Sequence, residues 1–230
     1  MANRIVGLLP MKAHSERVAG KNFRLFNGKP LFRWILDALL SIESIDQVVI
    51  NTDARALLAE NGLTDSERVC IRDRPAELCG DFVSMNRILA DDLAHVPADI
   101  YVMTHTTNPL LTAATIAGAI SRYKRGVANG IGDSLFTVQK IQTRFYRKDA
   151  SAVNHDPDNL IRTQDLEPWF EENSNLYIFS AASFAATNAR IGKMPILYEM
   201  TKTEGLDIDD KESWELAEAM ALYNSQKVSA

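Results

Sequence analysis

Short apolar runs alternate with longer segments of helical spacing along nearly all of this 230-residue chain. The runs are rich in β-branched residues and predict strands at residues 5–9, 47–51, 69–71, 99–103, 134–138, 175–179 and 206–209. The segments between them predict helices at residues 31–40, 54–60, 83–93, 112–123, 183–188 and 211–223. This alternation predicts an α/β fold with a mostly parallel sheet and helices on both faces.

Polar residues mark where three of these helices begin. Thr112 and Asp210 are the expected N-caps of the helices at 112–123 and 211–223, and Asp81 or Ser84 caps the helix at 83–93. Since ligands of parallel sheets bind outside the carboxyl ends of the strands, we expect a site where the first, second and fourth strands end.

The loop after the first predicted strand concentrates positive charge. It carries Lys12, Arg17, Lys21 and Arg24, with Gly20 among them. Cations this close together repel one another, and a polyphosphate bound by lysines, arginines and backbone N–H groups would relieve that repulsion. A solvated loop is the alternative from composition alone. The loop contains neither G-x-x-x-x-G-K-[ST] nor G-x-G-x-x-G, so it would bind phosphate in another way.

An acidic pair lies near the carboxyl terminus. On an extended strand, Asp207 and Asp209 would share one face while Leu206 and Ile208 point into the core. Two neighbouring carboxylates repel unless a cation lies between them, and Mg²⁺ is commonly held by one or two carboxylates together with substrate phosphates. The alternative is that Asp209 merely helps to cap the following helix.

Composition narrows the range of partners and compartments. The net charge of −5 argues against broad nucleic-acid binding. No apolar run has the length of a membrane span and we find no leader peptide, so we expect a cytoplasmic protein without a membrane partner. Cys70 and Cys79 show no metal-ligand spacing and read as unpaired thiols of a reducing compartment.

The alternation fails between residues 140 and 173. This stretch is polar and has no predicted helix or strand, yet it contains Trp169 and Phe170 side by side. In a monomer this aromatic pair would form an exposed apolar patch of the kind that marks interaction sites. Aromatic residues are enriched in subunit interfaces. We therefore expect residues 140–173 to form an arm that makes a homodimer.

Five segments resemble motifs of one enzyme family, the sugar-activating cytidylyltransferases, which include the CMP-acylneuraminate synthetases and, more distantly, the CMP-Kdo synthetases. They lie in the family's order and extend over most of the chain. The segments are residues 10–22 with 28–31, residues 74–78 with Asp81, residues 107–110, Asn173 with Tyr177, and residues 206–209.

The resemblance implies an α/β nucleotidyltransferase fold in one domain, 1–230, with the dimerisation arm 140–173 inserted in it. It implies a homodimer that uses Mg²⁺ and transfers CMP from CTP to the hydroxyl of an acidic, acylneuraminate-like sugar, releasing pyrophosphate. The alternatives are activation of Kdo, another keto-sugar or a phosphonate, and a non-catalytic nucleotide-binding homologue.

The resemblance also assigns roles to residues. The nucleotide-binding positions are Lys12, Ser15, Arg17, Lys21, Asn22, Arg74 and Ser84. The catalytic positions are Lys21, Asp207 and Asp209, of which the two aspartates would hold Mg²⁺. The positions that would hold the acyl-sugar are His105, Arg162 and Tyr177, with Arg162 reaching the partner's acceptor pocket.

Four positions depart from the family's pattern. Lys12 replaces an arginine, which keeps the charge but loses the planar bidentate group. Glu16 stands where many members have lysine, His105 replaces a glutamine and Leu111 replaces an arginine. His105 and Leu111, the departures at the third motif, are expected to affect how the acceptor binds rather than how CTP binds.

Overall fold

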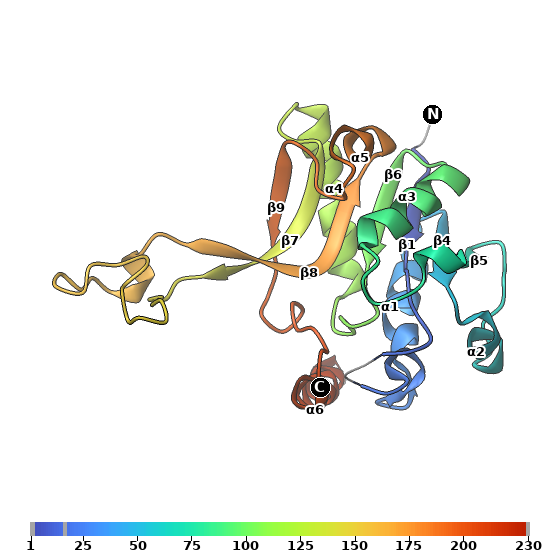
Figure 1. Ribbon diagram of the computed structural model, residues 1–230, viewed down its shortest axis with the longest axis horizontal. Helices are drawn as coiled ribbons and strands as arrows, with labels where there is room; N and C mark the ends of the chain where they lie inside the picture. Colours follow the sequence, from blue (N-terminus) through green and yellow to red (C-terminus); the bar gives the residue numbers. More distant parts are fainter. Residues whose placement is uncertain (1–2, 16–17, 229–230) are drawn as a thin grey trace.

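A seven-stranded sheet with the order β5-β4-β1-β6-β8-β7-β9 organises the computed structural model, which describes residues 3–15 and 18–228 (Figure 1). The strands are β1 (Ile5–Leu8), β4 (Gln47–Thr52), β5 (Val69–Asp73), β6 (Ile100–Thr104), β7 (Ser134–Ile141), β8 (Trp169–Phe179) and β9 (Pro195–Glu199). A small hairpin, β2 (Leu25–Phe26) with β3 (Lys29–Pro30), forms a second sheet. The helices are α1 (Leu31–Leu40), α2 (Arg55–Glu60), α3 (Met85–His95), α4 (Ala113–Ala128), α5 (Ala181–Thr187) and α6 (Lys211–Val228), and the 3-10 turns are η1 (Lys21–Phe23), η2 (Ala76–Leu78) and η3 (Thr163–Asp165).

Most neighbouring strands of the large sheet run parallel. β1 pairs in parallel with β4 and with β6, β4 pairs in parallel with β5, and β7 pairs in parallel with β9. Only β8 runs against its neighbours β6 and β7. The predicted α/β class with a mostly parallel sheet is therefore confirmed.

Both faces of the sheet are buried, which explains why its central strands read as continuous apolar runs. Along β6, Ile100 and Val102 join the core cluster that also contains residues of α1 and α4, whereas Tyr101 and Met103 join the cluster that contains residues of α3 and α5. Successive side chains of a strand point to opposite faces, so helices cover both faces, as expected.

A third core cluster ties the carboxyl-terminal helix to the loop after β1. Trp214 of α6 is 2% exposed and packs edge-on against Phe26, with ring centroids 5.5 Å apart. Ile208, just before α6, is fully buried in the same cluster. Arg24 lies over the Trp214 ring, 4.6 Å from its centroid. That arginine therefore stabilises the packing of α6 by a cation–π contact.

Two predicted N-caps are confirmed. The Thr112 hydroxyl accepts a hydrogen bond from the backbone N–H of Thr115 at the start of α4. The Asp210 carboxylate accepts one from the backbone N–H of Ser213 at 2.8 Å. Ser84 is the N-cap residue of α3, but its side chain makes no capping hydrogen bond.

The predicted strand at residues 206–209 is wrong. Residues 206–209 form no strand. The Ile208 N–H donates a hydrogen bond to the Thr107 carbonyl, in the loop after β6, at 2.9 Å. Alternating burial alone does not make a strand, because a strand also needs a neighbour with which to form a hydrogen-bonded ladder. Leu206 and Ile208 nevertheless pack into the third core cluster, as expected. The edge strand β9 was not predicted, because Pro195 and Glu199 leave an apolar run of only three residues between them.

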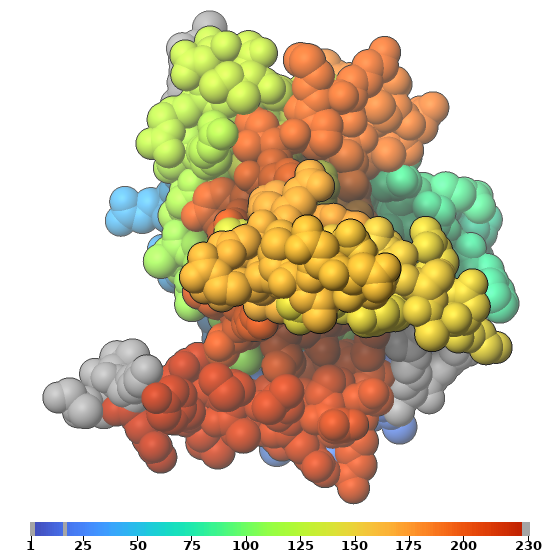
Figure 2. Space-filling view, turned by 90° about the vertical axis from the view of Figure 1, so that its left-hand side faces the viewer, coloured from blue at the N-terminus to red at the C-terminus, as the bar shows by residue number. Residues whose placement is uncertain are grey.

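The expected arm is present, but its two ends are strands rather than irregular chain. β7 continues to Ile141 and β8 begins at Trp169, and these two residues pair in a ribbon that leaves the sheet. The ribbon and residues 142–168 project far from the body in Figure 1, and Figure 2 shows the arm from its outer end, with α6 below it. The sequence pattern missed the ribbon because it has no buried face, so its side chains need not alternate.

Both cysteines are unpaired, in agreement with the sequence analysis. Within residues 3–15 and 18–228, no helix combines the length and the hydropathy that crossing a bilayer requires.

Candidate functional site

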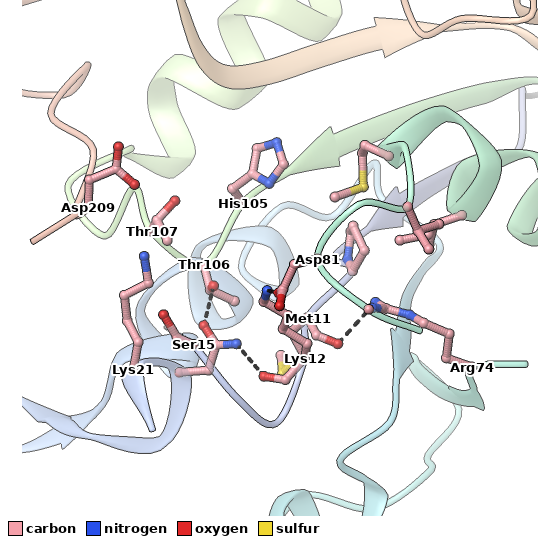
Figure 3. Close-up of a pocket in the computed structure, with 16 residues that line it drawn as sticks. Met11, Lys12, Ser15, Lys21, Arg74, Asp81, His105, Thr106, Thr107 and Asp209 are labelled. Atoms are coloured by element: carbon pink, nitrogen blue, oxygen red, sulfur yellow. Dashed lines mark hydrogen bonds and ion pairs between the residues drawn. The ribbon is translucent and has the colours of Figure 1, made fainter. Parts of the chain in front are cut away.

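A cavity of about 370 Å³, here called the first cavity, lies where β1 and β6 end (Figure 3). Ligands of α/β sheets bind at this edge, as the sequence analysis expected. The loops after β1 and β6 and the segment before α3 form most of the wall. The polar lining residues are Lys12, Ser15, Lys21, Asn22, Arg74, Asp81, His105, Thr106, Thr107 and Asp209.

Asn22 fixes the loop after β1 from one side. Its amide donates to the Lys12 carbonyl at 2.8 Å, and its carbonyl accepts from the Thr106 hydroxyl at 2.6 Å. Gly20 precedes it with φ of 59°, a left-handed conformation that glycine adopts without strain. The turn and the amide clamp together hold Lys12 and Lys21 at the cavity wall.

Arg74 fixes the same loop from the other side. Its guanidinium donates to the backbone carbonyls of Met11 at 3.0 Å and of Asn51 at 2.8 Å. The Asn51 side chain accepts a further bond from Arg74 and donates to Asp92 at 2.8 Å. Asp92 is fully buried on α3 and also pairs with Arg72. A chain of buried polar groups thus runs from the helix to the loop.

Lys12 contacts Asp81 across the mouth of the first cavity. The ammonium and the carboxylate form an ion pair in which both side chains are about two-fifths exposed. A pair with this exposure contributes little to stability, about 1 kcal/mol or less. A bound anion would therefore meet little resistance in competing with Asp81 for Lys12.

The acidic pair lies beside the first cavity, next to Lys21. The Lys21 ammonium donates to the backbone carbonyl of Ile208 at 2.6 Å, between the two aspartates in sequence. Asp209 lines the first cavity, and Asp207 is half-buried next to Asn108. Burial raises the pKa of Asp207, and the charge of Asp209 raises it further, whereas a hydrogen bond from Thr107 and the charge of Lys21 lower it.

This donor set fits Mg²⁺. Two carboxylates that repel each other lie beside a cavity with a cationic wall, and Mg²⁺ takes one or two carboxylates together with phosphate oxygens. No cluster of three or more His, Cys, Asp or Glu side chains that could hold a metal occurs in the described part of the chain.

Three predicted site residues lie elsewhere or are not described. Arg17 lies outside the described residues. Ser84 lines a separate cavity of about 330 Å³ together with Met85 and Arg190. Arg162 is exposed on the arm and pairs with Asp165, its Nε 2.7 Å from a carboxylate oxygen. The arm that carries Arg162 projects away from the body, so the structure does not bring this residue to the first cavity of its own chain (Figure 1).

The two remaining acceptor candidates differ in accessibility. His105 lines the first cavity, where burial lowers its pKa to about 3, with the charges of Arg190 and Lys21 as further causes. The imidazole is therefore neutral at pH 7. Tyr177 is only 1% exposed: it lies in the second core cluster, and the guanidinium of Arg190 lies 3.9 Å from its ring centroid. Arg190, rather than Tyr177, faces open space.

Sequence reasoning missed Asn51, Asp92 and Arg190. Asp92 could have been found, because it falls on the apolar face of its predicted helix, beside Ile88 and Leu89, where a charge needs a buried partner. Nothing in the local sequence around Asn51 or Arg190 indicates a site, since their contacts are to residues distant in the chain.

Comparisons with known proteins identify the family of this chain. A family model described as "Cytidylyltransferase" matches residues 6–228. The N-acylneuraminate cytidylyltransferase of Escherichia coli O18:K1:H7 is 23% identical over 222 residues, which are 94% of this chain and 52% of that protein. This chain thus spans about half the length of that relative.

Another relative matches over its whole length. The CMP-N,N'-diacetyllegionaminic acid synthase of Legionella pneumophila is 26% identical over 238 residues, covering 97% of this chain and 98% of that protein. Among solved structures, a CMP:2-keto-3-deoxy-manno-octonic acid synthetase complexed with CTP superposes with a TM-score of 0.67 at 14% identity, covering 96% of this chain and 99% of that one. At this identity the likeness concerns the fold.

The buried Asp92 should make stability depend on pH. Burial raises its pKa to about 6, against the opposing effects of Asn51 and Arg72. Between about pH 4 and pH 6 the folded state then binds more protons than the unfolded state, so the free energy of unfolding falls as the pH rises and levels off above pH 6. Urea unfolding from pH 4 to 8 measures this slope, and Asp92→Asn should flatten it. Glu60→Gln, which removes an exposed carboxylate of α2, should leave the slope unchanged. Equal slopes in wild type and Asp92→Asn would contradict the assignment.

Proposed function

Because this chain belongs to the cytidylyltransferase family, we propose that it transfers CMP from CTP to a hydroxyl of an acidic, acylneuraminate-like sugar and releases pyrophosphate. The observation that carries the proposal is the first cavity, where Lys12 and Lys21 lie on the loop after β1 and Asp209 lies nearby. Two relatives whose names give N-acylneuraminate and diacetyllegionaminic acid support an acidic nine-carbon acceptor.

The reaction needs positioning and charge more than covalent help. The acceptor oxygen forms a bond to the α-phosphorus of CTP, the bond from that phosphorus to the bridging oxygen of the β-phosphate breaks, and the hydroxyl proton passes to water. Lys12 and Lys21 face the cavity and are placed to neutralise the triphosphate and the departing pyrophosphate. The Asn22 and Arg74 contacts hold these lysines in place before CTP binds.

Mg²⁺ is part of the proposal, with Asp207 and Asp209 as its protein ligands. When bound, the metal would add positive charge at the phosphates and lower the pKa of the attacking hydroxyl. Its affinity should rest on deprotonated carboxylates. The charge of Asp209 is one cause of the raised pKa of Asp207, and a bound cation would offset this repulsion between the two carboxylates.

His105 contributes no positive charge to this chemistry. Because its pKa is lowered to about 3, the imidazole is neutral and can donate or accept a hydrogen bond with the acceptor. It carries no charge that would attract the acid group of the acceptor. The positive charge at the acceptor side must come from other residues.

We further propose a cytoplasmic homodimer. Two unpaired cysteines suit a reducing compartment. Large apolar side chains of the arm are exposed in the single chain, and an interface would cover them. They are Tyr146, Val153, Leu160, Ile161, Trp169 and Phe170.

The direct test is pyrophosphate release from CTP and Mg²⁺ with a panel of acceptors. N-acetylneuraminate should be turned over. Faster turnover of Kdo, another keto-sugar or a phosphonate would identify that compound class as the acceptor. In the same assay, Asp207→Asn or Asp209→Asn should lower turnover by about 100-fold or more while thermal melting stays near wild type. Asp210→Asn is the matched control, because asparagine also caps α6. No pyrophosphate release with any acceptor would favour a non-catalytic nucleotide-binding protein, and near-normal turnover of both variants at limiting Mg²⁺ would remove the metal assignment.

Lys21 should matter more for turnover than for binding CMP. Negative charge accumulates on the leaving pyrophosphate, a group that CMP lacks. Lys21→Ala should thus lower kcat more than it raises the Kd of CMP, as measured by steady-state kinetics and calorimetry. Lys193→Ala, which removes an exposed lysine, should change neither. Equal losses in kcat and CMP affinity would place Lys21 away from the leaving group.

The shared-site dimer has its own test. Light scattering should give twice the 25.6 kDa mass of the chain. Mixing inactive Arg162→Ala with inactive Asp207→Asn should restore part of the activity, because mixed dimers contain one intact site. Lys148→Ala, an exposed arm lysine, should stay active on its own. A monomer, or no complementation despite proven subunit exchange, would defeat the shared site.

A further inference from the structure

A second cavity adjoins the first. It has a volume of about 330 Å³, and Met85 lines both. Its wall comes from the start of α3, from β8 and from the loop after α5, and its polar side chains are Ser84, Asn86, Glu172 and Arg190. Because the two cavities share Met85, an acceptor that spans both would place its hydroxyl in the first and other groups against the wall of the second.

Arg190 is held rigidly at the wall of the second cavity. Its guanidinium lies over the Tyr177 ring, with 3.9 Å from Cζ to the ring centroid, and its Nη2 donates to the Tyr177 hydroxyl at 3.0 Å. The backbone N–H of Arg190 donates to the Asn86 side chain at 3.3 Å. Its side chain is 19% exposed. A planar cation fixed in this way is pre-organised for a ligand.

Much of the hydrogen-bonding capacity of Arg190 is unused. A guanidinium has five N–H donors, and among the described residues its side chain donates only to Tyr177. The closest carboxylate, that of Glu172, lies 3.9 Å from Nη2, beyond hydrogen-bond distance, and is 42% exposed. An ion pair of that length at the surface is weak. The remaining donors suit the two oxygens of a carboxylate.

Glu172 adds an acceptor to the same wall. It accepts a hydrogen bond from the Tyr177 hydroxyl, which fixes the orientation of its carboxylate. Sugar hydroxyls can donate to a carboxylate oriented in this way. A wall with one planar cation and one acceptor suits a polyhydroxylated acid better than a neutral sugar.

His105 feels charges from both cavities. Burial lowers its pKa, and the positive charges of Arg190 and Lys21 lower it further. Lys21 lines the first cavity and Arg190 lines the second, so cations of both cavities lie near this one side chain.

We propose that Arg190 binds the acid group of the acceptor and thereby makes the protein prefer a charged acceptor over its neutral analogue. This inference rests on the proposed transfer of CMP. It assigns the acid group to a residue of the second cavity, separate from the cations that bind the triphosphate.

The test compares an acid with its uncharged methyl ester. We would measure kcat/KM for N-acetylneuraminate and for its methyl ester in wild type, Arg190→Gln, Arg190→Lys and Arg87→Gln. Arg190→Gln should lower kcat/KM for the acid by about 10- to 100-fold, the effect of one charged hydrogen bond, while changing the value for the ester by less than about threefold. The KM of CTP should stay constant.

Two variants complete this comparison. Arg190→Lys keeps the charge without the planar fork and should be intermediate. Arg87→Gln is the control: it removes an exposed positive charge from α3, next to Asn86 in sequence. It should preserve the preference for the acid. An acid-to-ester ratio in Arg190→Gln equal to that of wild type would overturn the inference. If Arg190→Gln does not fold because Tyr177 is uncovered, Arg190→Lys takes its place. An acid-to-ester ratio below that of wild type then supports the inference, and an equal ratio overturns it.

A binding measurement separates this inference from the proposed function. If wild type releases no pyrophosphate with any acid, the proposed function fails, and calorimetry in the presence of CMP decides the role of Arg190. Wild type should bind N-acetylneuraminate more tightly than its ester, and Arg190→Gln should lose that difference. Wild type that binds both equally, or neither, would overturn the inference.

Discussion

Burial of Ile208 and Trp214 against Phe26 is the constraint on which the candidate site depends. It brings the carboxyl-terminal segment onto the loop after β1, so that the Lys21 ammonium bonds to the Ile208 carbonyl across 187 positions of sequence. The carboxylates on either side of Ile208 thereby come beside the cationic loop. Burying each large apolar side chain stabilises the fold by about 1.5–3 kcal/mol. This apolar packing keeps the carboxylates and the cationic loop next to each other.

The loop after β1 can present cations to an anion because its backbone is held from both sides. Asn22 binds the Lys12 carbonyl, and Arg74 binds the Met11 carbonyl. Arg74 is positioned in turn by Asn51 and, through it, by the buried Asp92. Such a network is rigid only while every member keeps its partners. An adaptable pair at the cavity mouth, Lys12 with Asp81, complements this rigid base.

The two cavities divide the proposed work. In the proposed reaction, Lys12 and Lys21 of the first cavity would act on the triphosphate, whereas Arg190 and Glu172 of the second would bind the acceptor. Separation of this kind allows the acceptor preference to change without disturbing nucleotide chemistry. His105 lines the first cavity as a neutral group and Leu111 is buried in the core, so neither supplies positive charge to an acceptor.

The sequence by itself determined the elements whose burial is periodic and local. The central strands, helix α1 and the caps Thr112 and Asp210 follow from neighbouring residues, because alternation and capping act within a few positions. The cationic loop was predictable for the same reason. Only the tertiary structure decided the antiparallel insertion of β8, the absence of a strand at residues 206–209 and the covering of Tyr177 by Arg190. These features depend on which distant segments pair and pack, and local periodicity carries no information about the identity of a distant partner.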